Sequence, residues 1–212
     1  MNVALQSNGK LAFQWRSRIR ETEREALLAA DVQSSVRLTP SLMRITTRVR
    51  LDMLQGHRDS FELWIPPGQM ISSLTGELVR DWNLPSGTNG TNASQVKISL
   101  AKVLDGVTTI QVVAEQPLAT LPSTAIIRIP RVIAAQRESG SLSISIEDLS
   151  AEIRQTTGVQ QINPSDGDLV AYRIQAQPVS ISLAIDRIAP QISTKDRVTL
   201  LEIGRASCRE RV

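Results

Sequence analysis

Apolar residues at every second position are the feature of this sequence that most restricts its fold. Between residues 43 and 53 the odd positions are mostly apolar, whereas the even positions are mostly polar or charged. Successive side chains of a β-strand point to opposite faces of a sheet, so this spacing predicts a strand with one buried face. The same spacing predicts further strands at residues 28–38, 61–65, 96–100, 110–114, 125–130, 142–146, 169–176, 179–185 and from 198 onward.

The number of these strands predicts an all-β fold. Many short strands separated by turns need two sheets to bury their apolar faces, which favours an antiparallel β-sandwich of the immunoglobulin-like or a similar type. The chain is 41% hydrophobic, which is enough to fill such a core. One short helix is predicted at residues 150–155.

Two connections between predicted strands are short enough for antiparallel hairpins. The first contains Gly56, and a register that sets Met53 opposite Phe61 brings apolar positions together along both strands. The same register sets Arg50 opposite Trp64 on the other face.

The second connection contains an Asp-Gly pair. A two-residue turn would oppose apolar and polar positions, whereas a three-residue loop at residues 104–106 with a left-handed Gly106 sets Leu100 opposite Ile110. The sequence therefore predicts a second hairpin with the longer loop.

Breaks rich in proline, glycine and polar residues interrupt the strands at residues 66–68, 85–94 and 136–140. The third break marks the predicted domain boundary. Four parts are expected: an N-terminal strand or linker from a preceding module at 1–26, a β-sandwich at 27–131, a second and incomplete β-module at 132–201, and a non-native tail at 202–212.

Charge and hydropathy argue against several classes of protein. The chain has 24 Lys and Arg residues against 21 Asp and Glu, which gives a formal charge of +3, and the basic residues are scattered. A nucleic-acid interface needs a concentrated basic patch, so none is predicted. No long apolar run is present, so no transmembrane segment is predicted, and the first residues do not resemble a signal peptide.

A binding site is predicted at Arg50 and Trp64. An arginine beside a tryptophan on an exposed sheet face forms a cation–π platform for a sugar or a peptide. The alternative is that this face packs against a neighbouring module or that the tryptophan only caps the edge of the sheet.

Few residues are candidates for metal binding. Asn163, Asp166 and Asp168 surround Gly167 and form a weak candidate for calcium, but the segment lacks the ligand spacing of an EF-hand. A plain Asx turn is the simpler interpretation. The single histidine, His57, has no second histidine as a partner, so no metal or cofactor is predicted.

Four carboxylates, Glu62, Glu77, Asp81 and Glu115, could include a glycosidase pair, but the sequence does not set any two at catalytic separation. Scattered and solvated charges are the simpler interpretation, so no catalytic residue is predicted. Trp82 is expected to anchor the core.

The closing stretch EIGRASCRERV differs in character from the strands before it. Residues 203–212 resemble the in-frame translation of a widely used sequencing adapter. This resemblance predicts that the natural sequence stops near Leu201, as in a fragment assembled from metagenomic DNA. Cys208, the single cysteine, is then not a native residue.

The order of four segments carries a second resemblance. They are VRLDMLQGHRDSFELWIPPG, SSLTGELVRDWNL, VKISLAKVLDGVTTIQVVAEQPL and IPRVIAAQRESGSLSI. This order resembles the repeated β-modules of very large, uncharacterised bacterial proteins that are secreted or belong to the cell envelope. The similarity extends over most of residues 10–200, in turns and core positions rather than in a catalytic motif. It implies one module of a longer extracytoplasmic chain whose export signal lies outside this fragment.

These features predict a non-catalytic structural or binding β-sandwich module of a larger bacterial extracytoplasmic protein. Its expected partners are neighbouring β-modules of the same chain and a carbohydrate or a protein, without nucleic acid. The alternative is an accessory or catalytic domain of a carbohydrate-active enzyme that uses an exposed Trp and carboxylate face.

We expect the gene in its own genome to continue past codon 201 with a sequence other than that of residues 203–212. It should encode an export signal and further copies of the module. Long-read sequencing of the genomic region tests both expectations, and a complete gene that stops directly after Val212 would contradict them.

Overall fold

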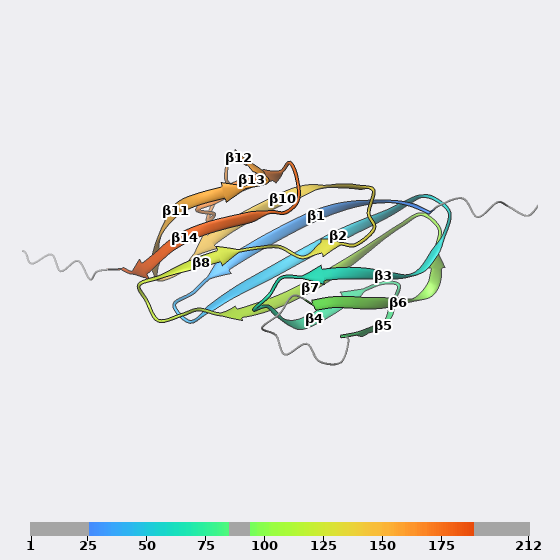
Figure 1. The fold of residues 1–212 in the computed structure, drawn as a ribbon, viewed down its shortest axis with the longest axis horizontal. Coiled ribbons are helices and arrows are strands. Elements are labelled where there is room, and N and C mark those ends of the chain that lie inside the picture. The colour runs from blue at the N-terminus through green and yellow to red at the C-terminus, as the bar shows by residue number, and fades with distance from the viewer. Residues whose placement is uncertain (1–25, 85–93, 189–212) are drawn as a thin grey trace, which may run out of the picture.

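The computed structural model describes residues 26–84 and 94–188, which form two packed layers of β-strands (Figure 1). No helix occurs in these two ranges, so the predicted all-β class is confirmed. The strands are β1 (Leu27–Leu38), β2 (Leu42–Gln55), β3 (Arg58–Ile65), β4 (Met70–Gly76), β5 (Val79–Asn83), β6 (Ser94–Leu104), β7 (Val107–Pro117), β8 (Ser123–Ile127), β9 (Arg131–Val132), β10 (Arg137–Ile146), β11 (Leu149–Thr157), β12 (Val159–Ile162), β13 (Val170–Ile174) and β14 (Ser180–Arg187).

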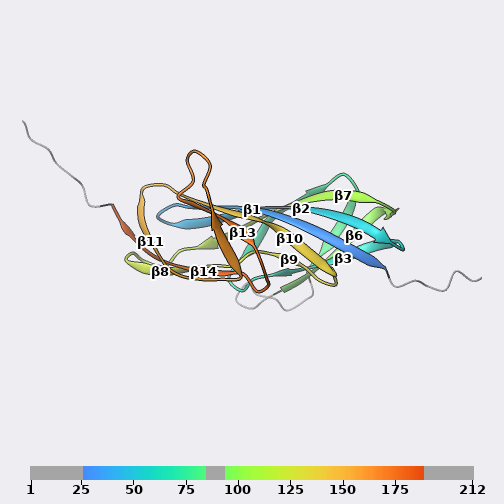
Figure 2. The same ribbon diagram turned by 90° about the horizontal axis from the view of Figure 1, so that it is seen from above.

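A seven-stranded sheet forms one layer. Its order is β12-β13-β10-β1-β2-β7-β4, and its neighbouring strands are antiparallel except for the parallel pair of β1 and β10. The other layer consists of a three-stranded sheet, β11-β14-β8, and a four-stranded sheet, β5-β6-β3-β9. Figure 2 shows these layers from the side. The fold is therefore of the β-sandwich type, as predicted.

The core lies between the layers and is filled by one face of each strand. On β1 every even position from Leu28 to Leu38 is buried, which confirms the face that the sequence predicted. Ser34 and Thr47 lie opposite each other on β1 and β2 within this core, and their hydroxyl oxygens are 3.0 Å apart. Their hydrogen bond satisfies two polar groups that burial separates from water. Trp82 is half-buried and packs against the core, as expected.

The first predicted hairpin is instead an arch between the two layers. β2 pairs with β1 and β7 in the large sheet, whereas β3 pairs with β6 and β9 in the four-stranded sheet. Met53 and Phe61 are both buried, but they face the core from opposite layers. Alternation determines which face of a strand is buried, and an arch buries the same residues as a hairpin. The predicted register was therefore wrong although the predicted faces were right.

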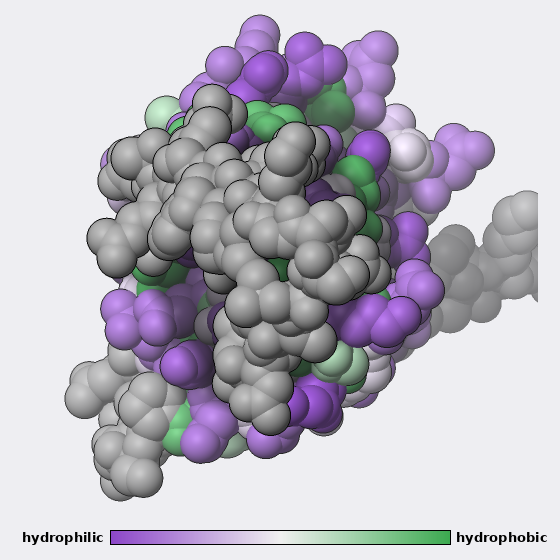
Figure 3. Space-filling model, turned by 90° about the vertical axis from the view of Figure 1, so that its right-hand side faces the viewer, coloured by the Kyte–Doolittle hydropathy of each residue, from purple (hydrophilic) through white to green (hydrophobic). Residues whose placement is uncertain are grey.

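The connection between β6 and β7 is a second arch. β6 belongs to the four-stranded sheet and β7 to the seven-stranded sheet, so Leu100 lies opposite Val79 instead of Ile110. Gly106 turns the chain with a φ of 121°. The Met53 N–H donates to the carbonyl oxygen of Gly106 at 2.8 Å, so the two arches lie side by side. Figure 3 views this end of the sandwich, where hydrophilic side chains predominate among the coloured residues.

The predicted boundary at residue 131 does not separate two modules among the described residues. β10 begins inside the break that suggested the boundary, and it pairs with β1 along ten residues. β13 and β12 extend the same sheet, and one buried cluster reaches from Leu28 to Ile185. Residues 27–131 and the described part of 132–201 therefore share one sheet and one core. The predicted parts 1–26 and 202–212 and the strand from residue 198 lie outside the described residues, apart from Ala26.

The helix predicted at residues 150–155 is wrong. This segment belongs to β11, which pairs with β14. Leu149 is buried, and Ala151 and Ile153 pack against the core, so the odd positions form the inner face. Pairing and burial override the local helix propensity of the segment.

We expect Gly140→Ala to destabilise the whole fold. Gly140 lies opposite Val32 in the parallel pair, and a Cβ atom there would overlap the carbonyl oxygen of Val32. A loss of about 3 kcal/mol or more is expected in the free energy of unfolding. Gly167→Ala is the control, because Gly167 also has a positive φ, 88°, but has open space around it, and roughly 1 kcal/mol is expected. If urea denaturation gives equal losses of unfolding free energy for the two variants, the close approach of Gly140 to β1 does not contribute to stability.

Candidate functional site

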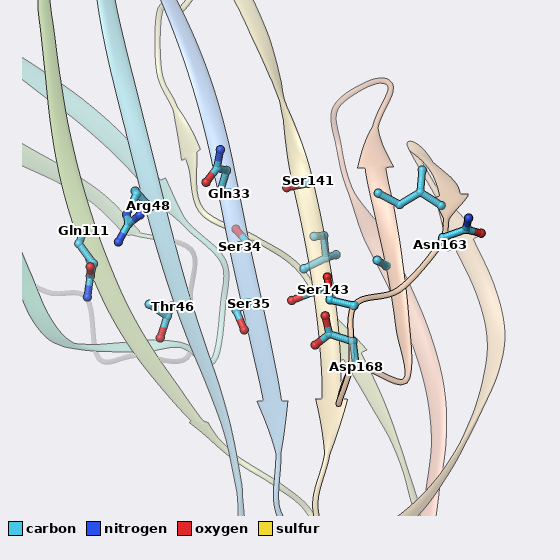
Figure 4. A pocket seen from close by; sticks show the side chains of 14 residues that line it. Gln33, Ser34, Ser35, Thr46, Arg48, Gln111, Ser141, Ser143, Asn163 and Asp168 are labelled. Carbon is cyan, nitrogen blue, oxygen red and sulfur yellow. The ribbon is translucent and has the colours of Figure 1, made fainter.

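A shallow groove of about 390 Å³ crosses the outer face of the seven-stranded sheet. Side chains that alternate with the buried positions point to this face, and the strand register aligns them in rows across β10, β1, β2 and β7. One row contains Ser143, Ser35 and Thr46, and the next contains Ser141, Gln33, Arg48 and Gln111. Figure 4 shows these side chains on neighbouring strands.

The loop between β12 and β13 forms one wall of the groove. Asn163, Ser165 and Asp168 from this loop line it together with Ser143 of β10 (Figure 4). The N–H of Leu169 donates to the carbonyl oxygen of Ile144 at 2.7 Å, which fixes the end of the loop against β10. Two of the three residues proposed as weak calcium ligands, Asn163 and Asp168, therefore line the groove.

The third member of that set, Asp166, is exposed and does not line the groove. The N–H of Asp168 donates to the carbonyl oxygen of Ser165 at 3.1 Å, so the segment forms a tight turn. Within the described ranges, no group of three or more His, Cys, Asp or Glu residues could hold a metal ion.

Most of the residues that line the groove are of polar types, and their formal charges cancel. Arg48 and Asp168 are the charged residues among its lining, and they have opposite signs. Most of the remaining lining side chains carry hydroxyl or amide groups, which can both donate and accept hydrogen bonds. Because the floor consists of paired inner strands, their backbone groups are engaged within the sheet, and side chains must make the contacts to a ligand.

Arg50 and Trp64 do not lie beside each other, so the predicted pairing is corrected. Arg50 lies on β2 opposite Asp31 and Thr109, one row beyond the groove on the same sheet face. Trp64 lies on β3 in the other layer, where its cross-strand partner is Arg131 on β9. The guanidinium carbon of Arg131 is 5.3 Å from the centroid of the Trp64 ring. A cation–π pair at Trp64 therefore exists, but a different arginine forms it.

Arg131 also lines a recess of about 420 Å³ beside β9. Glu138 enters this recess from β10, and Gln177 enters it from the turn before β14. The side-chain amide of Gln177 donates to Oε1 of Glu138 at 3.0 Å. Ala134 lies in the rim with a φ of 64°, which is unusual for a residue with a Cβ and costs roughly 1 kcal/mol or more.

Burial raises the pKa of Glu138 above the ordinary value for a glutamic acid, and the hydrogen bond from Gln177 and the positive charge of Arg131 oppose this rise. Even-numbered residues of β10, such as Leu142 and Ile144, point into the core, so Glu138 approaches the recess from the core side. This direction explains why water reaches its carboxyl group poorly.

The other residues considered from the sequence line neither the groove nor the recess. His57 is exposed in the first arch. Glu115 pairs with Arg44 at 2.8 Å on the large sheet, and Oδ1 of Asp81 accepts a hydrogen bond from the N–H of Trp82 at 2.8 Å. Like these two, Glu62 and Glu77 line neither the groove nor the recess.

Arg131, Glu138 and Gln177 could not be predicted from the sequence, because they come from separate segments of the chain and follow no regular spacing. Arg48 and Gln33 were not predicted either, since the polar positions of an alternating strand indicate an outer face without showing that this face contains a groove.

The fold places the chain among all-β proteins of the sandwich type. No protein-family model matches it, and no curated protein matches it. Among solved structures, the chain is similar to the M1 zinc metallopeptidase from Deinococcus radiodurans, with a TM-score of 0.45 and 8% identity. A mutant of the same enzyme bound to a Tyr-Ser-Ala substrate gives a TM-score of 0.43 and 8% identity.

Both comparisons cover 74% of this chain and 42% of the enzyme, so the chain spans less than half of the enzyme's length. In the part of the chain that the structure describes, no helix is long and apolar enough to cross a membrane.

We expect the stability of the protein to depend on pH through Glu138. Because its folded-state pKa is raised, its contribution to stability is fully present below the unfolded-state pKa and is lost as pH rises through the folded-state pKa. Glu138→Gln cannot ionise, so its free energy of unfolding relative to the native protein should increase between about pH 4 and about pH 7. Urea denaturation at both pH values measures this difference.

Glu62→Gln is the matched control for the loss of one carboxyl group, because Glu62 is exposed on β3 outside the recess. A constant difference between Glu138→Gln and the native protein at the two pH values would contradict the expectation.

Proposed function

We propose that this chain is a non-catalytic binding module of a larger bacterial protein that acts outside the cytoplasm, and that it holds a neutral oligosaccharide in the groove. The observation that carries the proposal is the pair of polar rows across the inner strands of the large sheet. The resemblance of the sequence to repeated envelope and secreted modules supports the proposed location.

The lining of the groove favours a sugar as the ligand. Sugar hydroxyl groups donate and accept hydrogen bonds, as do the serine, threonine, glutamine and asparagine side chains that line the groove. One positive and one negative side chain favour a neutral ligand over a strongly charged one. An extended peptide would instead pair with the backbone of an edge strand, and the groove crosses inner strands.

The size and shape of the groove also suit such a ligand. Its volume of about 390 Å³ lies within the range of about 300–1,000 Å³ that is usual for small-molecule sites. The floor consists of strands that pair on both sides, so its side chains are held in fixed positions before a ligand binds. Such preorganisation reduces the entropic cost of binding.

The proposal of a module without catalysis is supported by where the carboxylates lie. Asp168 is the single acidic residue in the lining of the groove, whereas glycosidases use a pair of carboxylates. A bound oligosaccharide should therefore be recovered intact.

Arg48→Ala tests the proposed site. We expect the full chain to bind at least one soluble oligosaccharide from a panel of bacterial and plant polysaccharide fragments, as measured by isothermal titration calorimetry. Loss of a charged hydrogen-bond donor should weaken this binding about 10- to 100-fold. Arg50→Ala is the control, because Arg50 is the next outward residue on the same strand and does not line the groove.

Three outcomes would contradict the proposal. They are the absence of binding across the panel, equal losses in the two variants, and cleavage of the bound oligosaccharide. The last of these would favour the carbohydrate-active enzyme.

A further inference from the structure

The recess beside β9 contains two opposite charges that do not form an ion pair. Arg131 and Glu138 both line it, and the charge of Arg131 acts on the Glu138 carboxyl. The ion pairs of the described residues are Arg37 with Glu147, Arg44 with Glu115, and Arg154 with Glu152. Arg131 and Glu138 therefore line a common space without an ion pair between them.

The neighbouring amides are engaged in contacts that hold the walls of this space. Gln136 accepts a hydrogen bond from the N–H of Leu28 at 2.7 Å and donates to the carbonyl oxygen of Ala26 at 3.4 Å. Gln177 donates to Oε1 of Glu138 and accepts from the N–H of Val179 at 3.2 Å. Oε2 of Glu138 and the guanidinium of Arg131 are then the groups best able to contact a ligand.

Trp64 prepares Arg131 for such a contact. The guanidinium carbon lies 5.3 Å from the centroid of the indole ring, and this cation–π contact limits the orientations that the guanidinium can take. An arginine held by such a contact loses less conformational freedom when it binds a carboxylate, so its affinity is higher than that of a free surface arginine.

We propose that this recess binds a small zwitterion of the amino-acid class, whose carboxylate pairs with Arg131 and whose ammonium group pairs with Glu138. A ligand with both charges supplies each protein group with its counter-charge. A simple anion would be repelled by Glu138, and a simple cation would be repelled by Arg131. The left-handed Ala134 at the rim supports the proposal, because strained backbone is concentrated at binding sites. The groove on the outer face of the seven-stranded sheet plays no part in it.

Trp64 fluorescence provides the test. The full chain with Trp15→Phe and Trp82→Phe keeps Trp64 as its single tryptophan. Glycine, L-alanine and L-serine are titrated to about 10 mM, with acetate and methylammonium as the matched halves of the zwitterion. We expect at least one amino acid to change the fluorescence in a saturable way, and neither half to do so at the same concentration.

Variants in the otherwise native chain locate the site by calorimetry. Arg131→Gln and Glu138→Gln should each weaken amino-acid binding at least about 10-fold. Arg137→Gln is the control, because Arg137 is an exposed arginine that neighbours Glu138 and does not line the recess. Circular dichroism shows whether each variant is folded. If Arg131→Gln is unfolded, Arg131→Lys replaces it, and weaker binding is expected because lysine cannot make a bidentate contact.

The proposal is overturned if no amino acid binds, if acetate or methylammonium binds as well as the amino acids, or if the Arg131 and Glu138 variants bind like the native chain. None of these results affects oligosaccharide binding in the groove, so failure here is distinguishable from failure of the proposed function.

Discussion

The parallel pairing of β1 with β10 is the contact on which the rest of the molecule depends. It joins strands that are far apart in the sequence, since Ala29 lies opposite Arg137, 108 residues later. A parallel pair needs a long crossover, and here the crossover contains most of the opposing layer. The entropic cost of closing such a loop grows only slowly with its length, so the buried faces of the two strands can offset it.

The groove and the recess both depend on this pairing. The rows of the groove continue from β1 to β10, where Gln33 lies opposite Ser141 and Ser35 lies opposite Ser143. The loop that walls the groove follows β12, which reaches the sheet through β13 and β10. The recess depends on the same strand, because β10 carries Glu138 to a position beside the β9 region. Two separate modules, as predicted from the sequence, would contain neither the groove nor the recess.

Much of the fold could be predicted from alternation alone, since the inner residues of β1, β2, β3, β6 and β7 were identified correctly. Alternation is a property of one strand at a time, however, and it does not determine the partner. Met53 and Phe61 are buried in an arch as fully as they would be in a hairpin, so the sequence pattern gave no signal to separate the two. Arg50 was set beside Trp64 by the same error, and the arginine that does contact Trp64 lies 67 residues further along the chain than that tryptophan.

The alternating direction of the side chains on β10 also explains how the groove and the recess, which differ in chemistry, share one strand. Its odd residues Ser141 and Ser143 face outward and give the groove neutral hydroxyl groups, whereas its even residue Glu138 faces inward and gives the recess a poorly hydrated charge. Pairing with β1 along its whole length, and with β13 over residues 141–144, holds the strand in place. Coupling between two sites requires an element with a second arrangement that both ligands can bias. A strand paired along its whole length does not offer one, so the groove and the recess are independent sites on the two faces of the same strand.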